Sequence, residues 1–182
     1  METVSTGLSQ KTQGSTYELV RTEIESRAFG PKPVPAEIKR SVLDAARLTG
    51  SGNNLQHLRF VLVHDKANLK RLASDSTTGG WVAGADFAVI VLIDPQYRFH
   101  MIDAGRAIQA MMLAAWGFGI GSGIFTGFKA DAMAKDFALP SNLNLTAVVG
   151  FGYPQKKILG KKNRKPLTEV AYLEKYGQKL TL

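Results

Sequence analysis

Hydrophobic and polar residues recur with a helical period through most of the first fifty positions. Ser15 and Glu18 have the spacing of a capping box, which predicts a helix that opens at Ser15 and ends before Gly30. A second helix is predicted around residues 38–46, because apolar side chains return there at helical spacing with charged residues between them. This helix should end at the glycine- and amide-rich run of residues 51–56.

Three later segments have the pattern of β-strands. Residues 58–64 are rich in β-branched and aromatic side chains, and residues 145–151 show a similar pattern near the end of the chain. Residues 85–93 form a nearly unbroken apolar run, which is typical of a central strand that helices cover on both faces. Short helices are predicted over residues 67–73 and 130–138. Helices and strands intermix without strict alternation, and this favours an α+β fold.

The most apolar helix is predicted over residues 104–116, after Asp103 as its N-terminal cap. Arg106 and Gln109 are its only strongly polar interior positions, so nearly the whole circumference should be covered by protein. Either the core of a larger domain covers this helix or a second subunit does. For a chain of this length, a dimer interface is a serious possibility.

Glycines alternate with other residues at 117, 119, 121 and 123, directly after this helix. A dinucleotide-binding fingerprint would require a preceding strand and different spacing, so we interpret Gly117 and Gly119 as a helix C-cap followed by a flexible connection. For Thr126 and Gly127 a functional interpretation stays open. A glycine between buried apolar residues lets its backbone N–H face a flat ligand.

The run of residues 51–56 (SGNNLQ) has two interpretations. Gly, Asn and Ser dominate turns for conformational reasons, so a solvent-facing turn would explain it. Amide side chains also offer both donors and acceptors, while Gly and Ser let a backbone approach a bound molecule. The second interpretation makes the run one wall of a ligand site.

The composition fits one soluble domain. The chain has 182 residues, of which 45% are hydrophobic, and this is enough for one core of ordinary size. Residues 1–14 are polar and do not resemble a signal peptide, so we expect a flexible extension followed by a single domain of residues 15–182. The apolar runs are too short to cross a bilayer, which favours a cytoplasmic protein with no membrane partner.

Several classes of catalytic site are excluded. The chain has no cysteine, so neither thiolate ligands nor a cysteine nucleophile are available. His57, His64 and His100 show no metal-ligand spacing with carboxylates, and we expect no metal site. Neither a P-loop nor a nucleophile elbow occurs in the sequence.

The net charge of +8 is concentrated near the end of the chain, where residues 155–182 hold eight Lys or Arg against two Glu. A solvated face, a nucleic-acid patch and a phosphate clamp would each explain this excess. Residues 156–165 contain no aromatic side chain that could stack on bases, which argues against nucleic acid as a partner. Lys162 and Arg164, on alternate positions of an extended segment, would point the same way and suit a phosphate. A final amphipathic helix is predicted over residues 167–176.

Taken together, several short motifs resemble the nitroreductase family of FMN-dependent oxidoreductases, in the same order and spacing, from about Tyr17 to the C-terminus. Each motif is short, and their collinearity makes the resemblance. The motifs are Arg27-Ala28-Phe29 with the prolines that follow, Ser51-x-x-Asn54-x-Gln56, the helix from Asp103 to Gly119, Phe125-Thr126-Gly127-Phe128, and the segments 149–154 and 162–167.

The resemblance implies a central, mostly antiparallel sheet surrounded by helices, with the long buried helix at a homodimer interface. FMN would bind at that interface, and the chain would pass electrons from NADH or NADPH to a nitroaromatic, a quinone or a similar small molecule by a ping-pong mechanism. No catalytic acid or base of the protein is required, because the flavin carries the chemistry.

The resemblance also assigns roles to single residues. Arg27 would approach the pyrimidine edge of the flavin, and the Gly127 N–H would face flavin N5, with Thr126 where an acidic residue often stands. The amide-rich run would contact the ring or the ribityl chain, and two cations near the C-terminus would hold the phosphate. The implied cofactor-binding residues are Arg27, Ser51, Asn53, Asn54, Gln56, Gly127, Lys162 and Arg164.

One segment departs from the family pattern. The family usually has Arg-Arg-Ser just before Arg-x-Phe, where this sequence has Glu23, Ile24 and Glu25. A phosphate contact is therefore missing, unless Arg21 or Ser26 replaces it after a local shift. The departure motivates an alternative function, flavin binding without turnover for storage or sensing. A basic nucleic-acid-binding module is a further alternative, and neither the acceptor nor the choice between NADH and NADPH follows from the sequence.

Overall fold

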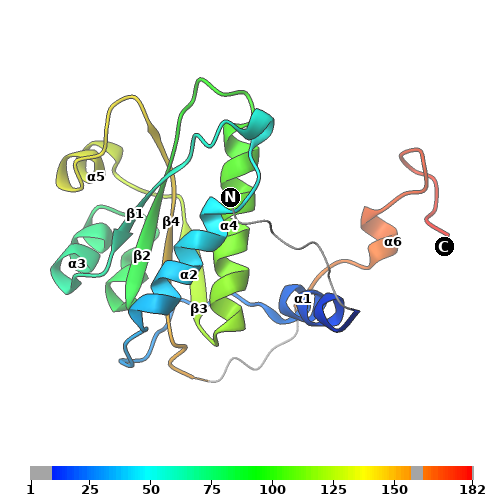
Figure 1. Ribbon diagram of the computed structural model, residues 1–182, viewed down its shortest axis with the longest axis horizontal. Coiled ribbons are helices and arrows are strands. Elements are labelled where there is room, and N and C mark those ends of the chain that lie inside the picture. Colours follow the sequence, from blue (N-terminus) through cyan, green and yellow to red (C-terminus); the bar gives the residue numbers. More distant parts are fainter. Residues whose placement is uncertain (1–9, 157–161, 182) are drawn as a thin grey trace, which may run out of the picture.

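A four-stranded antiparallel sheet forms the centre of the molecule (Figure 1). The computed structural model describes the backbone of residues 10–156 and 162–181. The strands are β1 (Arg59–Val63), β2 (Phe87–Ile93), β3 (Gly121–Phe125) and β4 (Asn144–Gly152), in the order β1-β2-β4-β3. All three neighbouring pairs are antiparallel. The predicted α+β class, with a mostly antiparallel sheet surrounded by helices, is confirmed.

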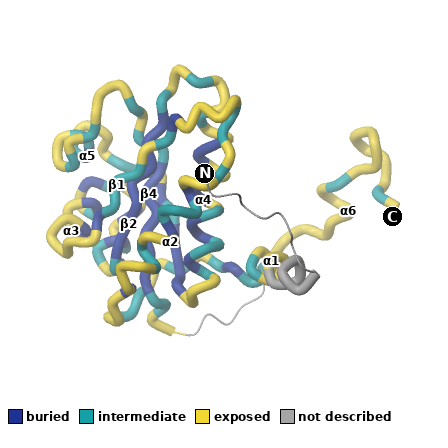
Figure 2. Tube along the Cα trace, in the orientation of Figure 1, coloured by how far each residue is buried: buried dark blue, intermediate teal, exposed yellow. Residues whose placement is uncertain are grey.

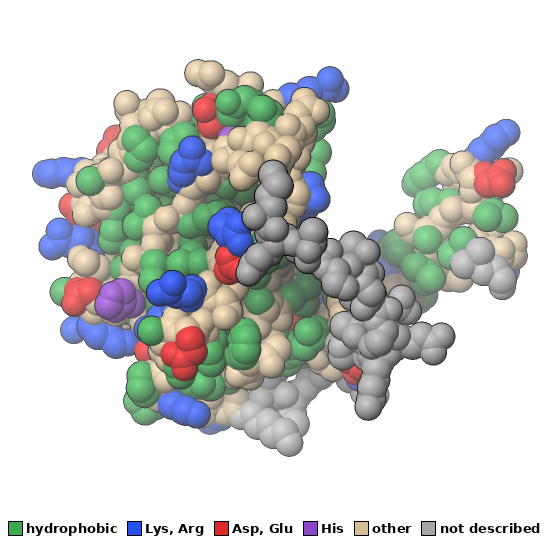
Figure 3. Space-filling view, viewed as in Figure 1, with side chains coloured by type: hydrophobic (Ala, Val, Ile, Leu, Met, Phe, Trp, Pro, Cys, Tyr) green, Lys and Arg blue, Asp and Glu red, His purple; other side chains and the backbone are tan. Residues whose placement is uncertain are grey.

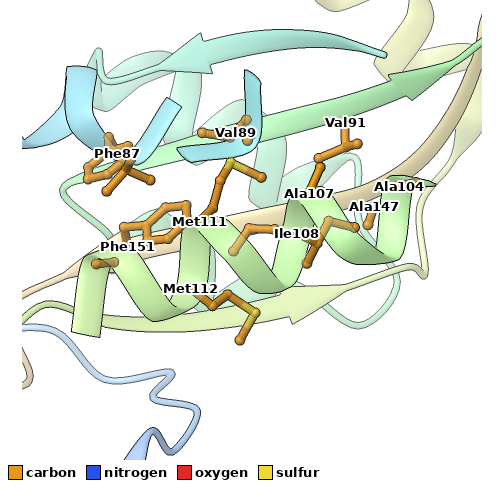
Figure 4. Close-up of a cluster of buried hydrophobic side chains, with 14 of the residues drawn as sticks. Phe87, Val89, Val91, Ala104, Ala107, Ile108, Met111, Met112, Ala147 and Phe151 are labelled. Carbon is orange, nitrogen blue, oxygen red and sulfur yellow. The ribbon is translucent and has the colours of Figure 1, made fainter. Parts of the chain in front are cut away.

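One face of the sheet is covered by α2 (Ala36–Arg47) and α4 (His100–Gly117). Alternate residues of β2, beginning with Phe87 and Val89, pack into this layer with α4 side chains such as Met111 (Figure 4). The ring of Phe87 stacks on the ring of Phe151 from β4. The predicted helix around residues 38–46 is therefore confirmed as α2, and its apolar side chains pack against α4.

The opposite face is covered by α3 (Lys66–Ser74) and α5 (Ala130–Asp136). The remaining residues of β2, such as Ile90, pack there with Leu72 and Met133. Because both faces are covered, all seven residues of β2 are buried, as the unbroken apolar run predicted (Figure 2).

The buried helix α4 begins earlier than predicted. It starts at His100 after Phe99, so Asp103 lies inside the first turn and is not the N-terminal cap. Its C-terminal end matches the interpretation of the first glycines. Gly119 has φ +74°, and the N–H groups of Gly119 and Ile120 return to the carbonyls of Trp116 and Ala115. This is a Schellman motif, which favours glycine at the left-handed position.

The first helix also differs from the prediction. α1 spans Gln10–Thr22, so its backbone starts five residues before Ser15 and the proposed capping box lies within the helix. Gln and Lys are good helix formers, which explains why the helix extends toward the N-terminus. It ends at Thr22, so residues 23–29 are free to cross toward the sheet. Residues 1–9 lie outside the described residues, and the domain boundary after residue 14 stays a prediction.

The glycine-rich stretch after α4 is a strand rather than a flexible connection. A Cβ on Gly123 would lie 2.7 Å from the carbonyl oxygen of Ser26, and one on Gly121 would lie 3.0 Å from the Ser26 side chain. Close approach of another segment therefore requires these glycines, and their lack of β-branched side chains concealed β3 in the sequence.

The last predicted helix is also too long. α6 spans only Leu167–Val170, after which positive φ values at Glu174 and Gly177 turn the chain and Tyr172 forms a β-bridge with Lys179. The segment of residues 167–181 projects from the rest of the molecule and exposes apolar side chains (Figure 3). Within the described part of the chain, no helix is long and apolar enough to span a membrane.

Candidate functional site

The amide-rich run folds into a tight loop at the N-terminal end of α4. Asn53, Asn54 and Gln56 all have positive φ, between 50° and 55°. The Ser51 hydroxyl accepts a hydrogen bond of 2.9 Å from the Gln56 N–H, which closes the loop. Asn tolerates the left-handed region better than most residues, so the turn interpretation of the run is correct. The ligand interpretation concerns the outward side of the same loop and stays a prediction.

Asp103 anchors this loop to α4. Its carboxylate is only 2% exposed, and Oδ2 accepts a hydrogen bond of 2.9 Å from the Gly52 N–H. The same oxygen lies 3.0 Å from His57 Nε2, and Oδ1 lies 3.4 Å from Arg106 Nη1. Burial disfavours the charged carboxylate, but the Gly52 and His57 hydrogen bonds outweigh it, so the pKa of Asp103 lies below its usual value. Sequence reasoning assigned Asp103 to a helix cap and missed this role; the only signal was a carboxylate in an otherwise apolar helix.

Arg27 lies at the outer edge of the sheet, beside β3. The Ser26 N–H donates a hydrogen bond of 2.7 Å to the Ser122 carbonyl, which adds this segment to the strand edge. The Arg27 guanidinium stands 5.8 Å from the ring centroid of Trp81, in the short helix η2 (Gly80–Gly84), and 3.7 Å from the Glu25 carboxylate. The side chain is largely exposed, so its charge is accessible from solvent.

Thr126 and Gly127 follow β3 directly. The Gly127 carbonyl accepts a hydrogen bond of 2.9 Å from the Thr77 N–H, while the Gly127 N–H makes no hydrogen bond within the described part of the chain. A Cβ on Gly127 would lie 2.5 Å from Thr77 Oγ1 and 2.6 Å from Thr78 Oγ1. Packing therefore requires glycine here, and the role of its N–H toward a ligand stays a prediction.

The two C-terminal cations border a cavity of about 640 Å³ between α4, β3 and the segment that follows α1. Its wall from α4 and β3 is mainly apolar, with one amide from Gln109. Its opposite wall carries two cations and two carboxylates. The lining residues used below are Gln109, Met112, Leu113, Ile124, Glu23, Glu25, Lys162 and Arg164.

Lys162 does not stand free in this cavity. Its Nζ donates a hydrogen bond of 2.6 Å to the Val20 carbonyl and lies 3.6 Å from Glu23 Oε2. Arg164 donates to the carbonyl of its neighbour Asn163 at 3.0 Å. The phosphate clamp predicted from the sequence therefore consists of one cation that is already paired and one that is exposed.

Neither residue suggested as a substitute for the missing arginines lines this cavity. Arg21 is ion-paired with Glu18 at 2.8 Å on the exposed side of α1. The Ser26 hydroxyl donates to the Ala28 carbonyl at 3.2 Å. The structure therefore gives no support for a shift that would bring them into the site.

A single chain does not gather all the predicted residues into one cavity. Ser51 and Gln56 line a different hollow of about 490 Å³ between α2 and β1. The run contacts α4 at Asp103, whereas Thr22 at the end of α1 bonds to Trp116 near the other end of α4. At 1.5 Å per residue these two points on α4 are about 20 Å apart.

The fold and the sequence together place the chain in a known family of proteins. The model of the nitroreductase family matches residues 21–94 and 79–153. The chain belongs to the nitroreductase family. The "Putative NADH dehydrogenase/NAD(P)H nitroreductase" of Archaeoglobus fulgidus is 28% identical over 148 residues, which cover 76% of this chain and 84% of that protein.

Solved structures agree with this family. The FMN-dependent nitroreductase of Clostridium difficile superposes with a TM-score of 0.80 at 19% identity, over 87% of this chain and 98% of that one. A crystal structure of "a putative nitroreductase in complex with fmn" from Desulfovibrio desulfuricans superposes with a TM-score of 0.75 at 27% identity, over 88% and 97% of the two chains. The first match supports the fold alone, and the second adds a relative with bound FMN.

Proposed function

We propose that this chain is an FMN-dependent oxidoreductase that passes electrons from NADH or NADPH to a nitroaromatic, a quinone or a similar small molecule by a ping-pong mechanism. The observation that carries the proposal is the cavity between α4 and β3, in a chain that belongs to the nitroreductase family. When bound, FMN would supply the redox chemistry by accepting a hydride and passing electrons to the acceptor.

The chemistry of the cavity fits this cofactor in most respects. Met112, Leu113 and Ile124 give an apolar wall suited to a flat ring, and the Gln109 amide offers both a donor and an acceptor. The exposed Arg164 guanidinium can bind a phosphate. Arg27 does not line the cavity, but its exposed guanidinium beside β3 would stabilise a negatively charged ring edge. The Glu23 and Glu25 carboxylates are the lining groups that do not suit a phosphate.

A second copy of the chain would complete the site. Ser51, Asn53, Asn54 and Gln56 do not line the cavity that Lys162 borders, so we assign them to a cofactor bound across a homodimer interface. Exposed apolar side chains on α4 support such an interface, since Met101 and Ile102 are 58% and 64% exposed. The site residues given above keep the roles implied by the family resemblance.

Anaerobic reduction of the bound flavin tests the proposal. Purified full-length protein should carry FMN, and NADH or NADPH should bleach its visible absorbance, which a nitroaromatic or a quinone should then restore. One alternative function is flavin binding without turnover. The ion pair of Glu23 with Lys162 favours it, because this pair leaves one cation fewer for the cofactor. Bound FMN that stays oxidised with both donors would establish that alternative and refute the oxidoreductase.

A further inference from the structure

A carboxylate stands where the phosphate of a bound flavin would need cations. Glu23 lies just after α1, lines the cavity and is only 8% exposed. Its Oε2 lies 3.6 Å from Lys162 Nζ, while its Oε1 is buried and has no hydrogen-bond partner among the described residues. The ammonium group also donates to the Val20 carbonyl. Lys162 is therefore already neutralised by its own chain.

Arg164 is in a different position. It is exposed, and no ion pair joins it to a carboxylate in the described part of the chain. The other carboxylate of the cavity, Glu25, lies 3.7 Å from Arg27 instead. An anion that enters the cavity thus meets one available cation and one that Glu23 compensates.

We propose that Glu23 determines how strongly this chain distinguishes FMN from riboflavin, and this proposal rests on the flavin function above. The two flavins differ only in a phosphate monoester at the end of the ribityl chain, which carries about two negative charges at neutral pH. A phosphate beside Lys162 must displace the Glu23 carboxylate or lie next to it, and like charges repel strongly in a partly buried site. Riboflavin escapes this repulsion. The cavity therefore takes unphosphorylated flavin nearly as well as FMN.

Titration of the flavin-free, full-length protein with FMN and with riboflavin measures this selectivity by the quenching of flavin fluorescence. The two dissociation constants of the wild type should lie within about tenfold of each other. Glu23→Gln keeps the shape of the side chain and removes its charge. It should tighten FMN by about tenfold or more, because Lys162 regains a charge-assisted contact, and change riboflavin by less than about twofold.

Two further variants control the measurement. Glu18→Gln makes the same change of charge on an exposed carboxylate outside the cavity, paired with Arg21, and should alter neither affinity. Adding Lys162→Met to Glu23→Gln should abolish the gain in FMN affinity. Thermal unfolding shows whether each variant folds. If Glu23→Gln does not, the wild-type ratio of the two dissociation constants decides.

The outcomes separate this proposal from the function on which it rests. A wild-type preference for FMN of more than about tenfold, or an unchanged ratio of the two affinities in Glu23→Gln, would overturn the role of Glu23 and leave the flavin function intact. Failure of the wild type and of every variant to bind either flavin would overturn the flavin function and, with it, this proposal.

Discussion

Asp103→Asn should lower the free energy of unfolding by about 2–4 kcal/mol, because a hydrogen bond to a charged group contributes about 1.5–3 kcal/mol and the carboxylate accepts two in the interior. These bonds come from the Gly52 N–H and from His57 Nε2, at 2.9 and 3.0 Å. Asparagine has nearly the same shape and keeps one acceptor oxygen, so part of the network survives. The remaining loss of stability comes from removing the negative charge and from leaving the Gly52 and His57 donors with a weaker acceptor.

The same residue makes stability depend on pH in a defined direction. The pKa of Asp103 lies below its usual value because the Gly52 and His57 hydrogen bonds outweigh the effect of burial. A carboxyl whose pKa is lowered by folding stabilises the protein fully above its unfolded pKa and loses that contribution as the pH falls through its folded value. The difference between wild type and Asp103→Asn should therefore be constant near neutral pH and shrink in acid.

Urea unfolding followed by circular dichroism, at neutral pH and at acid pH, measures both effects. Asp131→Asn is the matched control, because Asp131 is an exposed carboxylate on α5 and should change stability by less than about 0.5 kcal/mol. A loss below about 1 kcal/mol for Asp103→Asn at neutral pH would refute the anchoring role. A difference that grows in acid would refute the assigned direction of the pKa shift.

The remaining predictions concern the cations and the glycine of the site. Arg164→Ala should weaken FMN binding by about tenfold in a fluorescence titration, because the phosphate loses the one available cation among the described residues of the cavity, and an unchanged affinity would contradict this role of Arg164. Gly127→Ala should destabilise the protein by about 1–3 kcal/mol in urea, because the new methyl group meets Thr77 Oγ1 at 2.5 Å. Gly84→Ala is the control, since no neighbouring atom lies within 4 Å of a Cβ there. Equal losses of stability in urea for the two variants would contradict the steric argument.

Local pattern was enough to predict the layers of the fold. The run that became β2 could only be a strand covered on both faces, and the stripe of α2 required an apolar partner. β3 was missed because close approach of Ser26, a residue almost a hundred positions away, selects glycines that weaken the strand signal. The helix over residues 167–176 was overestimated because a hairpin bridge between Tyr172 and Lys179 replaces its second half.

The candidate site was predictable in its parts but not in its arrangement. The turn chemistry of residues 51–56 followed from composition, whereas the ligand role of Gly127 stays a prediction. The pairing of Glu23 with Lys162 joins residues 139 positions apart, so no local pattern indicates it. The anchoring by Asp103 was concealed in the same way, because its partners Gly52 and His57 reach it only after α4 has packed against the loop.

The most direct test of the proposed function is the visible spectrum of the purified, full-length protein before and after anaerobic addition of NADH and, separately, of NADPH. We predict a yellow protein that releases FMN on denaturation, whose flavin absorbance is bleached by at least one donor and returns when a quinone is added. A colourless protein that binds neither FMN nor riboflavin on titration would contradict the account.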